Sequence, residues 1–224
     1  MKPRTNARIA GTAFLLYIVA GIGSMVLFGR ISGGAGIGDR LSAISLHPAG
    51  AGVVILLGFV QTFCAITLGV TLFGITRVED PDLATFGLVS RVAEGIIGAT
   101  IPSTNALLWL GSLGTAAVPN PTSANAIAAL LLRVEGWQNL VSATFFAVGS
   151  TFFAVLFLRG RLIPAPLAWL GVIASVILSI ALPFQLAGFL QGTVTMIIWA
   201  PMLLFEVPLA FWLLVKGVAS PVKA

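Results

Sequence analysis

The chain has 224 residues, of which 58% are hydrophobic and only 8% are charged, and its formal net charge is +5. A soluble domain carries about 25% charged residues, so this composition excludes an ordinary water-exposed surface and predicts one integral membrane domain over residues 1–224, surrounded by lipid. The cations lie at the chain ends and between apolar runs, whereas a nucleic-acid partner would require cations clustered along one face.

A helix needs about 20 apolar residues to cross a bilayer. Runs of this kind predict an all-α fold, a polytopic transmembrane helix bundle with about six spans. The first four are expected at residues 9–28, 49–76, 86–113 and 137–158. A longer uncharged run follows, and the sequence GFLQGT at residues 188–193 divides it into a fifth span from about residue 166 and a sixth ending near residue 215.

Two connections on the side opposite the N-terminus are long. The first, at residues 30–48, is rich in glycine and is expected to be a flexible loop, because it lacks the lysine and hydroxyl of a phosphate-binding loop. The second, at residues 115–136, contains an Ala/Leu-rich run at 123–134 with high helix propensity. A bend at Gly136 would leave this run as a short interfacial helix.

The distribution of cations predicts the orientation. With the N-terminus inside, the outer side holds only Arg30, Arg40 and Arg133. The inner side then collects most of the remaining Lys and Arg residues: Lys2, Arg4, Arg8, Arg77, Arg159, Arg161, Lys216 and Lys223. This asymmetry satisfies the positive-inside rule, so we expect a multi-pass protein of the cell membrane with both termini in the cytoplasm.

Small residues at a spacing of four predict close helix contacts, because helices in lipid associate through tight packing rather than through the hydrophobic effect. The fifth span carries such a row at Gly171, Ser175 and Ser179. The third span carries another at Gly95, Ala99 and Ser103. We interpret both rows as helix-packing seams.

Three ionisable residues lie within the spans, where a charge costs about 2.5 to 3.5 kcal/mol on insertion scales and therefore marks a candidate site. Arg91 and Glu94 are three residues apart on the third span and share a face. Glu206 lies ten residues before Lys216 on the sixth, close to the membrane midplane. If these two spans are neighbours, Arg91 can reach both carboxylates, which gives the hypothesis of a buried Arg91–Glu94–Glu206 cluster that binds a ligand or a proton.

A structural alternative stays open for the same residues. Arg91 would extend its side chain to the inner headgroups, with Glu94 as its local partner. Glu206 would be protonated and donate a hydrogen bond to the carbonyl of Met202 or to one freed by a nearby proline.

Chemistry of other kinds has no positive signal. Cys64 is the only cysteine and His47 the only histidine, so a bis-histidine haem and the usual His-rich zinc site are excluded, and no cofactor or metal is expected. No serine or cysteine has a histidine and an acid in a plausible triad. The sequence therefore gives no pattern that favours an enzyme, and no catalytic residue is predicted.

Four segments resemble a family of bacterial multi-pass membrane proteins that carries only the label domain of unknown function four-three-eight-six. They are RIAGTAFLLYIVAG near the start, RVAE in the third span, GSTFFAVLFLRGRLIPAPLAWLG across the fourth and fifth, and FEVPLAFWLLVKG at the end. The resemblance implies a membrane bundle and puts Arg91, Glu94 and Glu206 on recurrent positions. One departure is Ala165, where members tend to have arginine. The family brings no known activity.

Two classes of function stay open. The first is a bundle that binds or transports a small apolar ligand, a lipid or a proton at the acidic cluster. The second is a structural, assembly or regulatory protein without a ligand of its own, which associates with itself or with another membrane protein. In the second class, substitution of Gly171 or Ser175 would abolish partner association.

Overall fold

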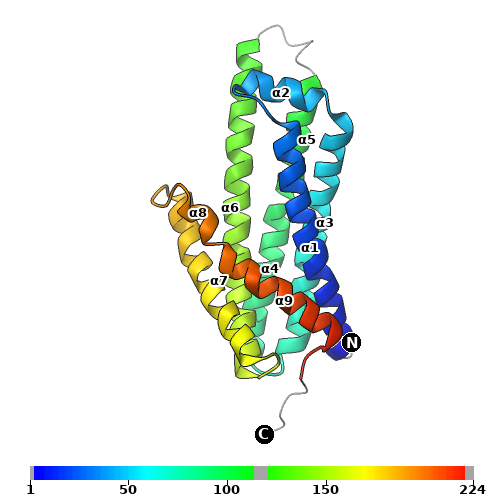
Figure 1. The fold of residues 1–224 in the computed structure, drawn as a ribbon, viewed down its shortest axis with the longest axis vertical. Helices are drawn as coiled ribbons and strands as arrows, with labels where there is room; N and C mark the ends of the chain where they lie inside the picture. The colour runs from blue at the N-terminus through cyan, green and yellow to red at the C-terminus, as the bar shows by residue number, and fades with distance from the viewer. Residues whose placement is uncertain (1–2, 114–120, 220–224) are drawn as a thin grey trace.

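The computed structural model describes residues 3–113 and 121–219, and within these residues the secondary structure is helical (Figure 1). Nine helices follow one another in the described residues. They are α1 (Pro3–Ile31), α2 (Ile37–Ser45), α3 (Pro48–Thr76), α4 (Pro81–Gly98), α5 (Thr100–Leu113), α6 (Pro121–Arg159), α7 (Ala165–Leu186), α8 (Val194–Ile197) and α9 (Ala200–Val215).

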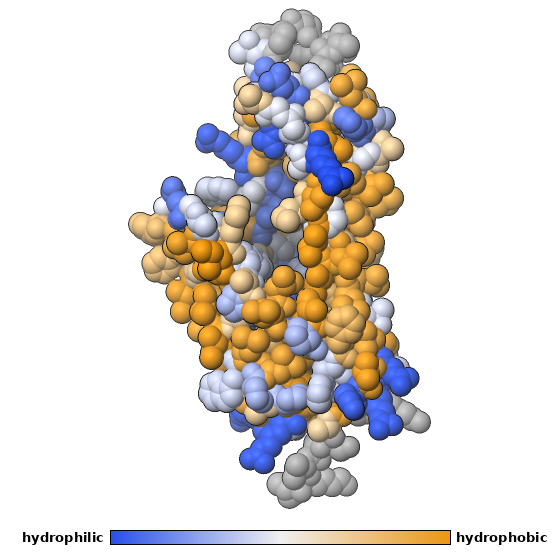
Figure 2. Space-filling model, viewed as in Figure 1, coloured by the Kyte–Doolittle hydropathy of each residue, from blue (hydrophilic) through white to orange (hydrophobic). Residues whose placement is uncertain are grey.

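Six stretches of these helices are long and apolar enough to cross a membrane, with α4 and α5 counting as one crossing and α8 and α9 as another. The predicted count of six spans is therefore confirmed, and the protein is a multi-pass membrane protein. Figure 2 shows the corresponding surface, where hydrophobic residues cover much of the length and hydrophilic residues gather near both ends.

Prolines explain where several helices begin and break. Pro81 follows the N-cap Asp80, whose side chain accepts a hydrogen bond of 3.1 Å from the backbone N–H of Leu83. This cap starts α4 five residues before the predicted boundary. Pro102 and Pro201 lack the N–H that would bond to the carbonyl four residues earlier. The breaks after Gly98 and Ile197 lie at the two carbonyls that these prolines leave free.

The predicted interfacial helix at 123–134 is wrong in its boundaries. The Ala/Leu-rich run and the fourth span form one continuous helix, α6, of 39 residues, about 58 Å long at 1.5 Å per residue. Gly136 does not interrupt it, since helical backbone bonds continue through a single glycine at a cost of only about 1 kcal/mol. The N-terminal part of α6 instead continues past the level of the α7–α8 turn (Figure 1).

The first outer connection is also more ordered than predicted. Residues 37–45 form α2, whose start is fixed by Asp39, because its carboxylate accepts a hydrogen bond from the backbone N–H of Gly36. Arg40 donates to the carbonyl of Ser32 at the end of α1. Buried Leu41 and Ile44 then join two small apolar clusters with α3, α5 and α6. The expected flexible loop is therefore a short helix that covers the end of the bundle opposite the start of α1 (Figure 1).

The membrane-spanning helices pack in a closed ring. Extensive contacts join α1 to α3, α3 to α4, α4 to α6, α6 to α7, α7 to α9, and α9 back to α1. In this order α4 lies across the ring from α9, and α1 lies across from α6. Side chains that point inward from opposite helices can therefore meet at the centre of the bundle.

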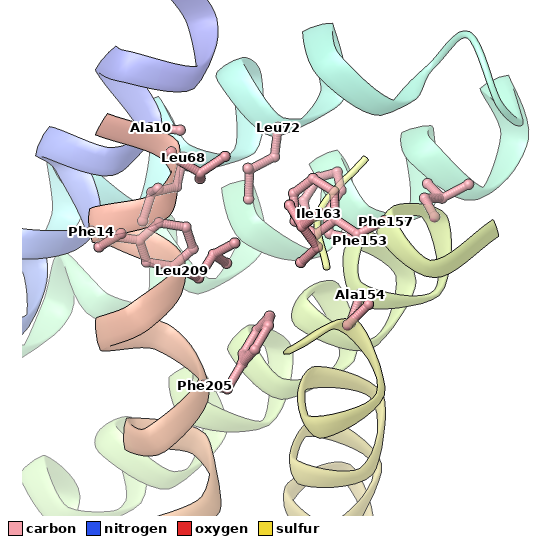
Figure 3. Packing of buried hydrophobic residues seen from close by; sticks show 14 of the residues in the cluster. Ala10, Phe14, Leu68, Leu72, Phe153, Ala154, Phe157, Ile163, Phe205 and Leu209 are labelled. Carbon is pink, nitrogen blue, oxygen red and sulfur yellow. The ribbon is translucent and has the colours of Figure 1, made fainter. Parts of the chain in front are cut away.

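The main apolar core fills the end of the ring that holds the chain termini. Figure 3 shows Ala10 and Phe14 of α1, Leu68 and Leu72 of α3, Phe153 and Phe157 of α6, and Phe205 and Leu209 of α9 in this core. The core thus contains buried side chains from all six membrane-spanning helices of the ring.

Candidate functional site

The polar centre of the bundle is built around Arg91 on α4. Its side chain is only 1% exposed, and Nη1 lies 2.9 Å from Oε2 of Glu94. Arg91 lies ten residues, about 15 Å, beyond the start of α4. A guanidinium at this depth and with this burial does not extend to the headgroups, so the geometry contradicts the structural alternative in which Arg91 snorkels.

Small residues on two neighbouring helices enclose the aliphatic part of Arg91. A methyl group placed on Gly69 of α3 would lie 2.9 Å from Cβ of Arg91, and one on Gly149 of α6 would lie 3.2 Å from its Cγ and Cδ. The absence of side chains at these two positions therefore lets α3 and α6 approach α4 closely. The guanidinium is consequently held at the centre of the ring.

Glu94 has a second partner that the sequence analysis missed. The phenol of Tyr17 on α1 donates a hydrogen bond of 2.7 Å to Oε1 of Glu94. In addition, Ser142 of α6 donates to the backbone carbonyl of Glu94. One signal for Tyr17 exists in the sequence: it is the only tyrosine, it lies in the middle of an apolar span, and a buried phenol generally requires a hydrogen-bond partner.

Aromatic rings complete the surroundings of the guanidinium. Cζ of Arg91 lies 5.5 Å from the ring centroid of Tyr17 and 5.0 Å from that of Phe146 on α6. These two rings are themselves stacked across the bundle, with centroids 6.2 Å apart, and Phe146 also stacks on Trp199 beside α9. Cation–π contacts of this kind are worth about 2 kcal/mol when desolvated, which partly offsets the cost of burying the charge.

Glu206 on α9 is the third member of the cluster, and it lies across the ring from Arg91. It is buried at 6% exposure and interacts electrostatically with both Arg91 and Glu94. The hypothesis that Arg91 reaches both carboxylates required the third and sixth spans to be neighbours. They are instead opposite each other in the ring, and no ion pair joins Glu206 to Arg91 in the described part of the chain.

Several polar atoms of the cluster have no hydrogen-bond partner among the described residues. They are the three guanidinium nitrogens of Arg91, Oε2 of Glu94 and Oε1 of Glu206. The ion pair between Arg91 and Glu94 is short, but its alignment falls outside that of a hydrogen bond. Buried polar groups are ordinarily hydrogen-bonded, so the centre has unused capacity for donors, acceptors and a proton.

The heights of the two acids agree with a position near the membrane midplane. Glu94 lies 13 residues, about 20 Å, beyond the start of α4 at Pro81, and Glu206 lies nine residues, about 14 Å, before the end of α9 at Val215. The hydrocarbon layer is about 30 Å thick. With the start of α4 and the end of α9 taken as its boundary, both carboxyl groups lie inside this layer.

The predicted seam on α7 lies at helix contacts within the chain. A methyl group on Gly171 would come within 2.5 Å of the Phe205 ring of α9, and Ser175 is fully buried. The hydroxyl of Ser179 lies 3.3 Å from that of Thr151 on α6. This row therefore faces α6 and α9 of the same bundle.

The predicted seam on the third span divides at the helix break. Gly95 faces α3, where an added methyl would lie 2.8 Å from Ile66. Ala99 is the C-cap residue that follows α4, and Ser103 on α5 is exposed. The spacing of four keeps residues on one face only in an unbroken helix. The expectation that Ser103 continues the seam is therefore wrong for contacts within this chain.

No metal site is apparent, since the described residues bring together no group of three or more His, Cys, Asp or Glu side chains that could hold an ion. Cys64 is a buried free thiol on α3, and His47 is exposed at the N-cap of α3. The ionisable side chains that the described residues bring to the centre are one guanidinium, two carboxyl groups and one phenol.

Comparison with known families agrees with the resemblance noted in the sequence. The model of the domain of unknown function DUF4386 matches residues 9–217, which cover nearly the whole chain and include Arg91, Glu94 and Glu206. The protein belongs to this family. No curated protein and no solved structure matches the chain.

Proposed function

We propose that this member of the family binds and releases a proton at the centre formed by Arg91, Glu94 and Glu206, with Tyr17 as the hydrogen-bond partner of Glu94. The observation that carries the proposal is the charge inventory of the centre. One buried guanidinium faces two buried carboxyl groups, so the centre is neutral only when one proton is bound. Because a net charge at membrane depth is costly, we expect the centre to hold one bound proton.

The two carboxyl groups differ in their partners. Glu94 has the Arg91 guanidinium on one oxygen and the Tyr17 phenol on the other. Oε1 of Glu206 has no hydrogen-bond partner in the described residues. Two carboxyl groups in such different surroundings take different roles. Glu94 is the fixed counter-ion of Arg91, and Glu206 is the group that exchanges the proton.

The same atoms argue against a small apolar ligand, which was the other occupant considered for this centre. An apolar molecule would leave the guanidinium nitrogens and the carboxyl oxygens without partners, at a cost of roughly 1 to 3 kcal/mol for each group. Water molecules and a bound proton would instead give these nitrogens and oxygens hydrogen-bond partners. The structural alternative also loses support, because Gly171 and Ser175 are already occupied by contacts within the chain.

The proposal is tested by infrared difference spectroscopy of the protein in lipid nanodiscs as the pH is changed. A protonated carboxyl group has a C=O absorption that an ionised one lacks. We expect this band to vary with pH in the wild type and to be lost in Glu206→Gln. Asp82→Asn, which alters an exposed acid on the same helix as Glu94, serves as the matched control and should retain the band.

Two results would overturn the assignment. If a pH-dependent band persists in Glu206→Gln and disappears in Glu94→Gln, the proton exchanges at Glu94 and not at Glu206. A folded Glu206→Gln variant whose spectrum matches that of the wild type at every pH would remove the centre from proton binding. Folding of each variant is checked by circular dichroism and by its elution as a single species.

A further inference from the structure

Two adjoining hollows lie near the end of the bundle where α1 begins and α9 ends, and neither is bordered by a residue of the polar centre. The larger, of about 360 Å³, runs between α1 and α3 and is bordered by Arg8 together with apolar and small residues. The smaller, of about 170 Å³, lies between the first turns of α1 and the end of α9. Arg8 borders both hollows.

The larger hollow has the form of a groove for a hydrocarbon chain. Its floor consists of small buried residues, Ala13 at 5% and Cys64 at 8% exposure, while Leu16 and Phe63 on its rim are 50% and 66% exposed. Small side chains between larger ones leave a depression that lipid or a ligand must fill. The groove is open toward the surrounding membrane, because its rim residues are exposed.

The smaller hollow gathers three cations from distant parts of the sequence. Arg4, Arg8 and Lys216 border it, and all three are exposed. Neither hollow is bordered by an acidic residue, and none of these cations forms an ion pair in the described part of the chain. The site therefore complements a negative charge.

Close packing of α1 against α9 holds these cations together. A methyl group on Gly11 would lie 2.7 Å from the carbonyl oxygen of Ala210, which shows that the two helices meet with no side chain between them. Gly217 ends α9 with a φ of +74°, and a methyl group there would lie 3.9 Å from Cγ of Arg4. This positive φ favours glycine, and Gly217 borders the same hollow as Arg4 and Lys216.

We propose that this end of the bundle binds one anionic phospholipid, with its phosphate between Arg8, Arg4 and Lys216 and one acyl chain in the groove between α1 and α3. Each cation near a membrane surface raises the affinity for anionic lipid by about fivefold. This effect of charge alone would also occur in an unstructured basic segment. The groove between α1 and α3 adds a fixed binding place for an acyl chain next to these cations. The proposal does not rest on the proton-binding function, because none of Tyr17, Arg91, Glu94 and Glu206 borders either hollow.

Native mass spectrometry of the whole protein tests this site. The protein is released from detergent after incubation with equal amounts of phosphatidylglycerol and phosphatidylcholine, and the tightly retained lipid is identified. We expect the wild type to retain one phosphatidylglycerol. The double variant Arg8→Gln/Lys216→Gln should lose this preference by roughly 25-fold, at about fivefold for each cation.

The matched control is Arg77→Gln/Arg161→Gln, which removes the same charge from two other exposed positions at the same end and should retain the preference. Equal losses in both double variants would overturn the site, because the effect would then depend only on overall charge. The absence of any preference in the wild type would do the same. If Arg8→Gln/Lys216→Gln does not fold, Lys216→Gln alone should lower the preference by about fivefold, and no change would overturn the proposal.

A competition experiment separates the lipid from a free phosphate group. Glycerol 3-phosphate carries the charge without acyl chains and should fail to displace the retained phosphatidylglycerol at equal concentration. Displacement as effective as that by phosphatidylglycerol itself would show that the groove contributes nothing, which would overturn the proposed lipid site.

Discussion

Tyr17 and Glu94 are 77 residues apart in the chain, and the phenol of one donates a 2.7 Å hydrogen bond to the carboxylate of the other. The bond joins α1 to α4, two helices that are not adjacent in the ring. This hydrogen bond therefore forms only when the helices of the ring are packed together. It also fixes the orientation of Glu94 toward the Arg91 guanidinium.

Substituting Tyr17→Phe should destabilise the protein by about 1 kcal/mol, because it removes this hydrogen bond while keeping the ring that stacks on Phe146. Hydrogen bonds between membrane helices are worth about 0.6 kcal/mol on average and up to about 1.7. The free energy of unfolding in mixed micelles measures the effect. Thr144→Val is the control, since it removes a hydroxyl bonded only within its own helix and should change stability by a few tenths of a kcal/mol. Equal effects in the two variants would contradict the prediction.

A double-mutant cycle of Arg91→Met and Glu94→Gln should give a coupling energy of about 1 to 3 kcal/mol. Arg91→Met alone is expected to cost about 3 to 5 kcal/mol, because it leaves buried carboxyl groups without their cation. The same cycle on Arg159 and Asp80, an exposed ion pair at 3.3 Å, should give less than about 1 kcal/mol. Additive effects of Arg91→Met and Glu94→Gln would show that the buried contact carries no specific energy.

Gly171→Ala should destabilise the bundle by about 1 to 3 kcal/mol through overpacking, because the new methyl group would meet the Phe205 ring at 2.5 Å. Adding Phe205→Leu should recover part of the loss. Gly136→Ala is the matched control, since no atom of the described residues lies within 4 Å of its added methyl group. It should leave stability unchanged or raise it by up to about 1 kcal/mol. A larger loss at Gly136 would argue that α6 bends there.

Cysteine labelling tests the orientation with both termini in the cytoplasm. In a Cys64→Ala background, Leu46→Cys and Val78→Cys place single thiols at exposed positions beyond opposite ends of α3. Because Val78 follows Arg77 at the cation-rich end, a membrane-impermeant maleimide should label Leu46→Cys in intact cells. It should label Val78→Cys only after permeabilisation. The reverse pattern would place the termini outside.

Local sequence signals predicted many features of this protein. Apolar length predicted six crossings, because hydrocarbon permits few other backbone structures. The rarity of intramembrane charge singled out Arg91, Glu94 and Glu206 as candidates. The errors at α2 and at Gly136 arose where short-range preferences are weak: a glycine-rich segment became helical through contacts of Leu41 and Ile44, and one glycine did not interrupt a long helix.

Only the tertiary structure decided which of these residues meet. The sequence gives the height of a residue along its helix, since the rise per residue is constant, and the heights of Glu94 and Glu206 were thereby comparable. It does not give the order of helices around the ring, which depends on close contacts such as Gly69 with Arg91 and Gly11 with Ala210. That order places α4 opposite α9 and brings Tyr17 and Phe146 to Arg91. Among the described residues it gives Glu206 no ion pair.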